Sequence, residues 1–183
     1  ERDMSSSLLH VISHTDLDGI AAAAVAWHRW RGERPLKVSL AGYGAVDGLI
    51  LESIAAGQDF LVVDLFCQDS RTVDALDRHY SEGGDPFVFD HHETTAARYG
   101  ARPWAVVDTA FCAAKVYYRW LLGRGAPGME RLAPLVELAN ERACNAYGFT
   151  PARIQGAGDP GMPLFNHGLP AGTYGVVVGP DGS

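Results

Sequence analysis

Residues 8–30 read LLHVISHTDLDGIAAAAVAWHRW. Residues 8–14 are mostly apolar and predict a strand, whereas the Ala-rich part from Gly19 to about Trp30 predicts a helix. A strand that leads directly into a helix is the opening half of a βαβ unit, and such units build parallel sheets. This stretch therefore predicts an α/β fold.

The rest of the chain continues this alternation of short apolar runs and helical patterns. Expected strands are 36–40, 60–65, 87–89, 104–107 and 174–178, and expected helices are about 46–56, 70–80, 110–122 and 129–144. The near-continuous hydrophobicity of Phe60-Leu61-Val62-Val63 is typical of a strand covered on both faces. We therefore expect an open, mostly parallel sheet with helices on both faces.

The 183 residues suffice for one full domain, or for one domain and part of another. We assign residues 8–147 to the main domain. Residues 148–183 are expected to form a linker and the beginning of a second, C-terminal domain, because Gly and Pro are frequent from 148 to 172. The strand at 174–178 is followed by the turn sequence Pro180-Asp181-Gly182. Its pairing partner is therefore expected outside this chain, which would make the chain a piece of a longer protein.

Composition excludes several classes of protein. With 47% hydrophobic residues the chain is not expected to be disordered, and no apolar run approaches the roughly 20 residues of a membrane span. A net charge of −7 argues against a grip on long duplex nucleic acid. The cysteines Cys67, Cys112 and Cys144 are odd in number and lack CxxC spacing, so we expect no disulfide framework and a reducing, cytoplasmic setting.

Acidic and histidine residues follow three of the predicted strands, at the edge where open α/β sheets bind ligands. His14, Asp16 and Asp18 recur at every second position after the first strand, so an extended backbone would project all three to one side. Gly19 then opens a helix whose N–H groups favour an anion. Asp64 closes a buried strand, and Asp90-His91-His92 closes the next.

This residue set predicts divalent cations. Ionised carboxylates at one edge repel one another, and a mixed set of carboxylate oxygens and imidazole nitrogens relieves the repulsion by binding metal. Two metals about 4 Å apart are the usual arrangement for hydrolysing phosphate esters. The mixture favours Mn²⁺, with Mg²⁺ as the alternative, and disfavours zinc because no thiolate pattern accompanies it.

The motifs resemble those of the DHH phosphoesterase superfamily, named for the Asp-His-His that stands here as Asp90-His91-His92. His14-Thr15-Asp16-Leu17-Asp18-Gly19 is similar to the family's first motif and Val63-Asp64 to its second. The first motif most resembles the nano-RNase and cyclic-nucleotide phosphodiesterase branch, followed by RecJ-type exonucleases. The resemblance covers about residues 8–122 and implies a Rossmann-like DHH domain.

The resemblance also implies a role for each matching residue. His14, Asp16 and Asp64 would hold one Mn²⁺, and Asp18, Asp64 and His91 the other. Asp90 would orient His91, and His92 would contact the scissile phosphate. A water bridging the metals would attack phosphorus in line. The implied activity is phosphodiesterase or phosphatase hydrolysis of short single-stranded oligonucleotides or small nucleotides, without membrane partners; a homodimer is compatible with the sequence.

Two departures from the family pattern keep other functions open. The family's fourth motif carries an Asp, but residues 135–142 read LVELANER and offer only Glu137 or Glu141 as substitutes. The family's C-terminal substrate-binding domain with its Gly-Gly-Gly-His stretch is also missing. One alternative is therefore a degenerate member that binds nucleotide or metal without hydrolysis. Another is a haloacid-dehalogenase-type phosphatase that uses Asp16 as nucleophile, although neither Lys37 nor Lys115 lies where that fold needs its lysine.

Overall fold

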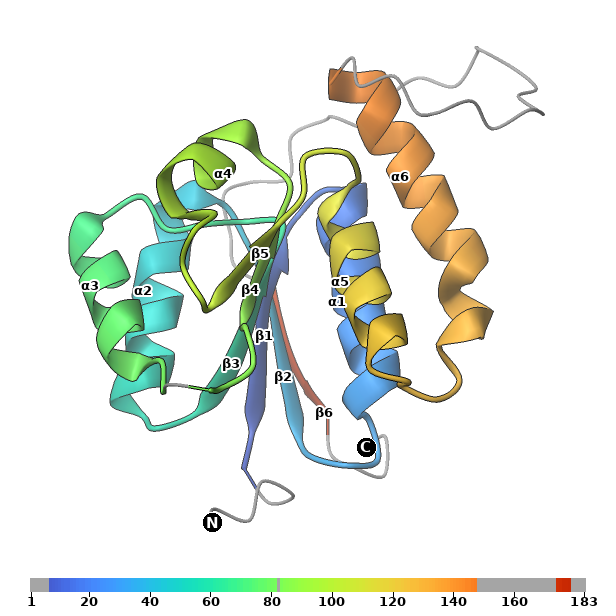
Figure 1. Ribbon diagram of the computed structural model, residues 1–183. Helices are drawn as coiled ribbons and strands as arrows, with labels where there is room; N and C mark the ends of the chain where they lie inside the picture. Colours follow the sequence, from blue (N-terminus) through green and yellow to red (C-terminus); the bar gives the residue numbers. More distant parts are fainter. Residues whose placement is uncertain (1–6, 82, 148–173, 179–183) are drawn as a thin grey trace.

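The structure is a computed structural model that describes residues 7–81, 83–147 and 174–178 (Figure 1). Its sheet has the strand order β5-β4-β3-β1-β2-β6. The first five strands in the chain run parallel, and β6 pairs antiparallel with β2. The strands are β1 (Leu9–His14), β2 (Leu36–Ala41), β3 (Asp59–Val63), β4 (Val88–Asp90), β5 (Ala105–Val107) and β6 (Tyr174–Val178).

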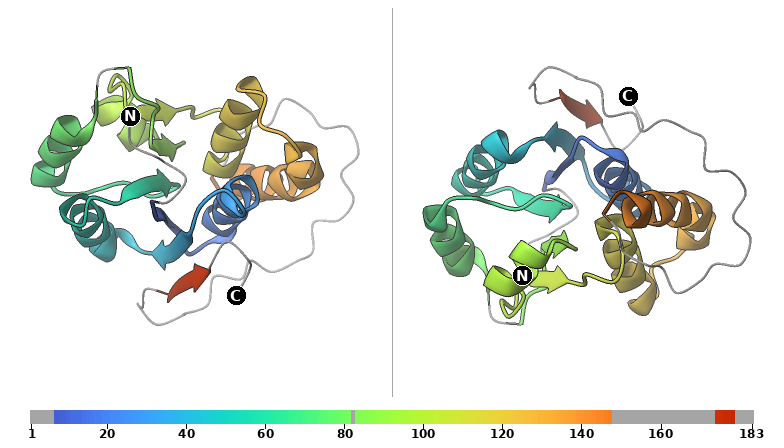
Figure 2. Two further views of the ribbon diagram at one scale, coloured as in Figure 1. Left: turned by 90° about the horizontal axis from the view of Figure 1, so that it is seen from below. Right: turned by 90° about the horizontal axis from the view of Figure 1, so that it is seen from above.

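Helices cover both faces of this sheet (Figures 1 and 2). On one face lie α1 (Leu17–Trp30), α5 (Ala113–Gly123) and α6 (Ala133–Tyr147), with the 3-10 helix η1 (Met129–Leu132) between the last two. On the other face lie α2 (Tyr43–Ala55), α3 (Ser70–His79) and the short α4 (Glu93–Tyr99). The expected fold class, an open and mostly parallel α/β sheet with helices on both faces, is confirmed.

Each face of the sheet has its own hydrophobic core. The core beneath α1 includes Ala21, Ala22 and Ala26, all fully buried, whose small side chains let the helix backbone lie close to the strands. The opposite core contains larger groups, including the buried Trp104, whose indole N–H donates to the carboxylate of Asp77 on α3. Strands β1 and β3 lie between the two cores, and all their residues except His14 and Asp59 are buried.

The strand order places a topological switch at the centre of the sheet. After β1 the chain adds β2 on one side, and it then returns to add β3, β4 and β5 on the other. The connections therefore diverge between β1 and β3, and a crevice forms outside the carboxyl ends of strands at such a point. His14 ends β1 and Asp64 follows β3, so both flank this crevice.

Several element boundaries differ from those expected. Strand β3 stops at Val63 because Asp64 adopts a left-handed backbone conformation with φ of 61°. Helix α5 begins at Ala113 and not at 110, since the carboxylate of Asp108 accepts the backbone N–H of Ala110 and holds a turn there. The helix α4 was not predicted at all; it is short, and His92 at its N-cap gives no capping hydrogen bond to signal it.

The last described strand corrects the expectation about its partner. The predicted strand at Tyr174–Val178 exists, but β6 pairs with β2 of the same sheet, from Tyr174 opposite Leu40 to Val178 opposite Leu36. The strand does not need a partner outside this chain. The boundary proposed at 147/148 stays a prediction, because residues 148–173 lie outside the described residues.

Two smaller expectations concern membranes and thiols. None of the helices in the described ranges combines the length and the apolarity needed to cross a membrane. Cys67 and Cys112 are free and buried. Burial raises the pKa of the Cys67 thiol to about 12, which makes it a packing residue and not a nucleophile.

A buried histidine connects three elements away from the crevice. His10 on β1 is 1% exposed; its Nδ1 lies 2.8 Å from Oγ of Ser53 on α2, and its Nε2 lies 2.8 Å from Oγ of Ser39 on β2. The hydroxyl of Ser53 donates to the carbonyl of Leu49, so it accepts from Nδ1–H, and Nε2 then accepts from Ser39. His10 is therefore neutral in the folded protein.

Acid is expected to destabilise the protein through His10. Burial, assisted by Lys37, lowers the pKa of His10 from 6.5 to about 4. Between these two pH values His10 is protonated in the unfolded chain but not in the folded protein. The free energy of unfolding therefore falls as pH decreases from 6.5 toward 4. From pH 7.5 to pH 5 we expect a loss of about 2 kcal/mol from this group. Urea unfolding at both pH values tests this, with His10→Gln as the variant in which this part of the pH dependence should vanish; equal losses in both proteins would contradict it.

Candidate metal centre

Asp64 directly follows β3, at the point where the strand order reverses between β1 and β3. Its backbone N–H still donates to the carbonyl of Phe89, 3.0 Å away, so the residue remains tied to β4 after β3 has ended. The side chain is buried, with Oδ1 3.3 Å from Nε2 of His91 and Oδ2 4.0 Å from Nδ1 of His14. Within the described residues Oδ2 has no hydrogen-bond partner. A buried carboxylate oxygen without a partner is costly, and a bound cation would offset that cost.

His14 and Asp16 lie on one side of Asp64. Asp16 is the N-cap of α1, where Oδ1 accepts the N–H of Gly19 at 3.0 Å while Oδ2 lies 2.9 Å from Nδ1 of His14. Burial alone would raise the pKa of Asp16, but the hydrogen bonds from His14 and Gly19 outweigh it and lower the pKa to about 2. Asp16 is thus ionised over the whole physiological pH range. Its carboxylate caps α1 through one oxygen and contacts His14 through the other.

Gly19 allows this turn to close. A Cβ atom built on Gly19 would lie 2.6 Å from the carbonyl carbon and 2.7 Å from the Cα of His14, both backbone atoms. Only glycine fits where the first turn of α1 passes so near the end of β1. The close approach is what brings His14 and Asp16 into contact.

Asp18 reaches the site by a route that the sequence spacing did not predict. It lies in the first turn of α1 and not on extended backbone, so its side chain does not align with His14 and Asp16 through strand alternation. Instead it crosses to α5, where its two oxygens accept the N–H groups of Ala113 and Ala114, each at 2.8 Å. Burial nevertheless raises the pKa of Asp18. Its Oδ2 lies 3.6 Å from Nε2 of His91.

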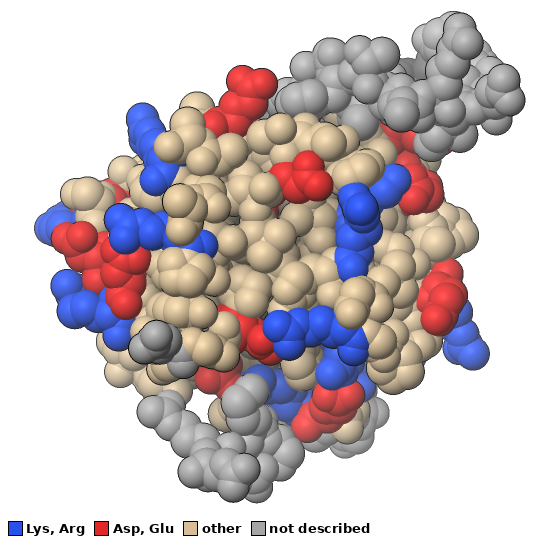
Figure 3. Space-filling model, viewed as in Figure 1, with Lys and Arg blue, Asp and Glu red and all other residues tan. Residues whose placement is uncertain are grey.

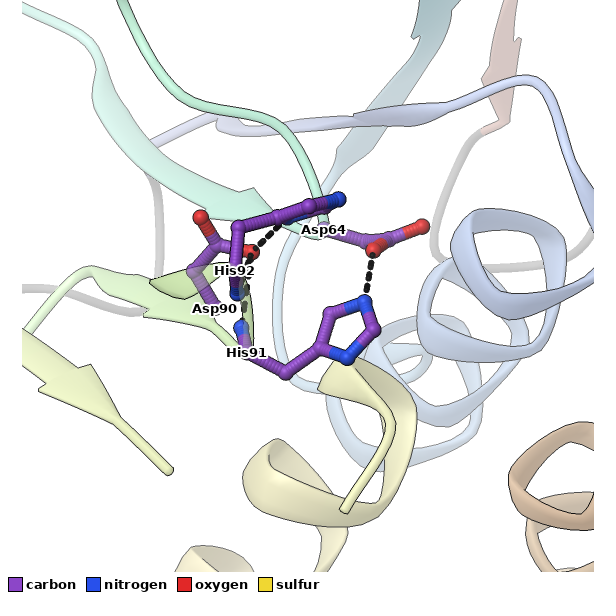
Figure 4. Close-up of side chains that lie close together, drawn as sticks. All are labelled: Asp64, Asp90, His91 and His92. Atoms are coloured by element: carbon purple, nitrogen blue, oxygen red, sulfur yellow. Dashed lines mark hydrogen bonds and ion pairs between the residues drawn. The ribbon is translucent and has the colours of Figure 1, made fainter. Parts of the chain in front are cut away.

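Asp90, His91 and His92 end β4 and enter α4 (Figure 4). The rings of the two histidines diverge: His91 points to Asp64, whereas Nδ1 of His92 lies 2.7 Å from Oδ1 of Asp90. This oxygen also accepts the backbone N–H of His91 at 2.8 Å. The hydrogen bond with Asp90 raises the pKa of His92, whereas burial lowers the pKa of His91. Asp90 thus contacts the ring of His92, in addition to the backbone of the residue that it was expected to orient.

Two groups of metal-ligand atoms result, and they share Asp64. In each group the ligand atoms lie within 4.8 Å of one another; one is His14, Asp16 and Asp64, and the other is Asp64, Asp90, His91 and His92. Asp18 belongs to neither, although it lies beside His91. Burial, reinforced by the charges of Asp18 and Asp16, raises the pKa of Asp64 well above its usual value. Carboxylates crowded in this way are compatible with divalent cations, whose presence stays a prediction.

The structure does not place either expected substitute for the fourth motif at the centre. Glu137 is 43% exposed and forms an ion pair with Lys115 at 2.7 Å, and Glu141 is exposed. Asn140, which lies between them in the chain, is buried, and its Oδ1 accepts the backbone N–H of Cys112 at 2.9 Å. It steadies the start of α5, next to the N–H groups that hold Asp18. Its place on the buried side of the predicted helix was the only sequence signal for this role.

Comparisons with other proteins bear on the fold alone. No protein-family model matches this chain, and no curated protein does. Among solved structures it is similar to a crystal structure of an uncharacterized protein from Helicobacter pylori G27, with a TM-score of 0.55 and 25% sequence identity. The match covers 78% of this chain and 44% of that chain, so this chain corresponds to less than half of its neighbour.

Proposed function

We propose that this protein is a metal-dependent phosphoester hydrolase of the DHH type, acting on short oligonucleotides or small nucleotides. The observation that carries the proposal is the pair of ligand groups that share the buried Asp64. A carboxylate shared by two ligand groups could help to hold two cations close together, and paired cations are the usual arrangement for hydrolysing phosphate esters. The resemblance of the three sequence motifs to those of DHH phosphoesterases supports the same reading.

The residues divide into two proposed ligand sets. His14, Asp16 and Asp64 would hold one cation, and Asp64 with His91 would hold the other, with Asp18 beside them. Mixed oxygen and nitrogen ligands favour Mn²⁺ over Mg²⁺. The cations would supply a hydroxide nucleophile near neutral pH and neutralise charge that develops on the phosphate.

His92 has a separate part in the proposal. Its Nδ1 is engaged by Asp90, so that any contact with a substrate phosphate would come from Nε2. The same hydrogen bond raises the pKa of His92 and thereby favours the protonated ring, which donates to an anionic oxygen. Asp90 fixes the orientation of the ring, because its own carboxylate is buried and held by the backbone of His91. His92 would bind and orient the phosphate that is cleaved.

A second candidate is a protein that binds metal or nucleotide without hydrolysis. It is favoured by one observation, namely that Glu137 is paired with Lys115 and that neither it nor the exposed Glu141 supplies the missing fourth-motif carboxylate. In both candidates the ligand binds at the same centre. They differ only in turnover.

The proposal is tested by metal addition followed by assay. At a hundredfold excess over its dissociation constant, Mn²⁺ should stabilise the protein by about 2.7 kcal/mol and raise the melting temperature by at least about 5 °C. Products are then separated by chromatography from a dinucleotide, a longer single strand, cyclic AMP, 3′-phosphoadenosine 5′-phosphate and pyrophosphate, with chelator as control. Cleavage that chelator abolishes supports the hydrolase, and stabilisation by Mn²⁺ without cleavage supports the second candidate. If Mn²⁺ neither stabilises the protein nor supports cleavage, the proposed metal centre is refuted.

A further inference from the structure

Asn140 on α6 is a polar side chain in an otherwise apolar part of the core. Val136 lies one turn before it and Ala143 one turn after it, and both belong to the core beneath α1. The surface over α5 and α6, on the right of Figure 3, carries charged side chains of both signs. Asn140 is 3% exposed and does not belong to that surface. A buried amide is costly unless it is hydrogen-bonded, and Asn140 bonds to the start of α5.

The start of α5 is bound by two side chains from neighbouring helices. The N-cap residue Cys112 forms no side-chain capping hydrogen bond, and its backbone N–H donates to Oδ1 of Asn140 at 2.9 Å. The next two N–H groups, of Ala113 and Ala114, donate to the two oxygens of Asp18, each at 2.8 Å. Three consecutive N–H groups are thus held, one from α6 and two from α1. Because planar peptide groups connect them, a displacement of Cys112 would also move the donors that hold Asp18.

The carboxylate of Asp18 extends this chain of contacts to the metal centre. Its Oδ2 lies 3.6 Å from Nε2 of His91, and the same nitrogen lies 3.3 Å from Oδ1 of Asp64. We call Asp18, Asp64 and His91 the His91 side of the metal centre, and His14, Asp16 and Asp64 the His14 side. Every residue of the His91 side is buried, whereas the side chains of His14 and Asp16 are 24% and 41% exposed. Contacts inside the protein therefore set the orientation of the His91 side.

We propose that Asn140 is a positioning residue of the metal centre: it fixes the start of α5, which holds Asp18 beside His91 before a cation binds. The inference rests on the metal centre of the proposed function and does not require turnover. With the N-cap residue of α5 fixed from α6, Asp18 loses less freedom when a cation binds. Side chains that orient metal ligands in this way contribute about ten- to a hundredfold to metal affinity.

The experiment measures binding of Mn²⁺ alone, by calorimetric titration of the metal-free protein. Asn140→Leu keeps the branched shape of the side chain but removes the acceptor. It should raise the dissociation constant of one Mn²⁺, at the His91 side, about tenfold or more, and change that of the other by less than about threefold. Asn140→Asp keeps an oxygen at the position of Oδ1, so both affinities should stay within about threefold of the wild type.

Asp77→Ala is the matched control for a general loss of stability. Asp77 accepts the indole N–H of the buried Trp104 at 2.8 Å, in the core on the opposite face of the sheet. Asp77→Ala and Asn140→Leu each leave a buried N–H group without its acceptor, so both should lower the melting temperature of the metal-free protein. Only Asn140→Leu should weaken the binding of Mn²⁺.

Hydrogen exchange of the wild type tests the same link in the reverse direction. Because coupling between two sites is reciprocal, Mn²⁺ should slow exchange of the amides at the start of α5, those of Cys112, Ala113 and Ala114. The slowing should exceed that of the Tyr80 amide, which donates to Leu76 at the end of α3, by about tenfold. This measurement decides the inference if Asn140→Leu does not fold.

The outcomes separate this inference from the proposed function. Weaker binding of one Mn²⁺ in Asn140→Leu but not in Asp77→Ala, in a protein that hydrolyses no phosphate ester, would support the positioning role and refute the hydrolase. Affinities that Asn140→Leu leaves unchanged, or that Asp77→Ala lowers equally, overturn the inference even if substrates are cleaved. Equal slowing of exchange at Tyr80 and at the start of α5 overturns it as well.

Discussion

Asp64→Asn is expected to slow turnover on the order of a thousandfold, a barrier increase of about 4 kcal/mol, while leaving the metal-free protein at least as stable as the wild type. The loss of activity follows from the position of Asp64 in both ligand groups. Asn keeps the size of the side chain and tolerates the left-handed backbone at φ 61°, so that the substitution removes charge without adding strain. Metal should no longer stabilise the variant.

The stability of this variant has a definite pH dependence. The pKa of Asp64 in the folded protein is raised by burial and by Asp18 and Asp16, so the ionised group costs stability at pH values above its unfolded pKa. In metal-free buffer Asp64→Asn should therefore be more stable than the wild type at pH 7, and this gain in stability should shrink toward pH 4.

Asp74→Asn, on the exposed side of α3, is the matched control and should change neither activity nor stability. Chemical unfolding at pH 7 and pH 4, together with steady-state kinetics, provides the measurements. Wild-type turnover by the Asp64 variant would refute the shared-ligand assignment. A variant that is less stable at pH 7 without metal would refute the electrostatic argument.

Gly19→Ala is expected to destabilise the protein by about 3 kcal/mol or more. Its Cβ would overlap the backbone of His14, which cannot rotate away as a flexible side chain could. The end of β1 would have to move, and His14 and Asp16 would move with it. Metal affinity should therefore fall together with stability.

A glycine-to-alanine substitution at Gly48 should change stability in the opposite direction. Gly48 lies inside α2, and a Cβ there meets nothing within 4 Å. Gly48→Ala should stabilise the protein by about 0.5 to 1 kcal/mol, because Ala is the better helix former. Thermal unfolding and Mn²⁺ titration of both variants provide the measurements. Similar changes in stability at the two positions would show that crowding against His14 does not cause the loss of stability in Gly19→Ala.

The sequence predicted the location of the site better than the orientation of its side chains. Asp64 and Asp90 could be placed at one edge because parallel strands end together, and that argument needs only the order of apolar runs. The role of Asp18 could not be predicted in this way. Its partners Ala113 and Ala114 lie some 95 residues later, and nothing in their own side chains signals that their N–H groups will be bound.

Local backbone geometry could not be predicted from the sequence either. The apolar run into Leu65 suggested a longer strand, but the left-handed Asp64 ends β3 two residues earlier. The short helix α4 follows a pair of histidines without a side-chain cap. Asn140 gives no signal of its own, because an uncharged amide does not mark a metal site and its burial arises only from the packing of the fold.

The pairing of β2 with β6 has a consequence for growth of the sheet. An uncovered β2 would present six residues of backbone N–H and C=O groups as a template for strands from other molecules. β6 occupies this edge in the antiparallel sense. At the opposite edge β5 is only three residues long and offers little to extend. β6, with five residues, is then the edge strand on that side, so both edge strands are shorter than β2 and offer a smaller template for intermolecular strand addition.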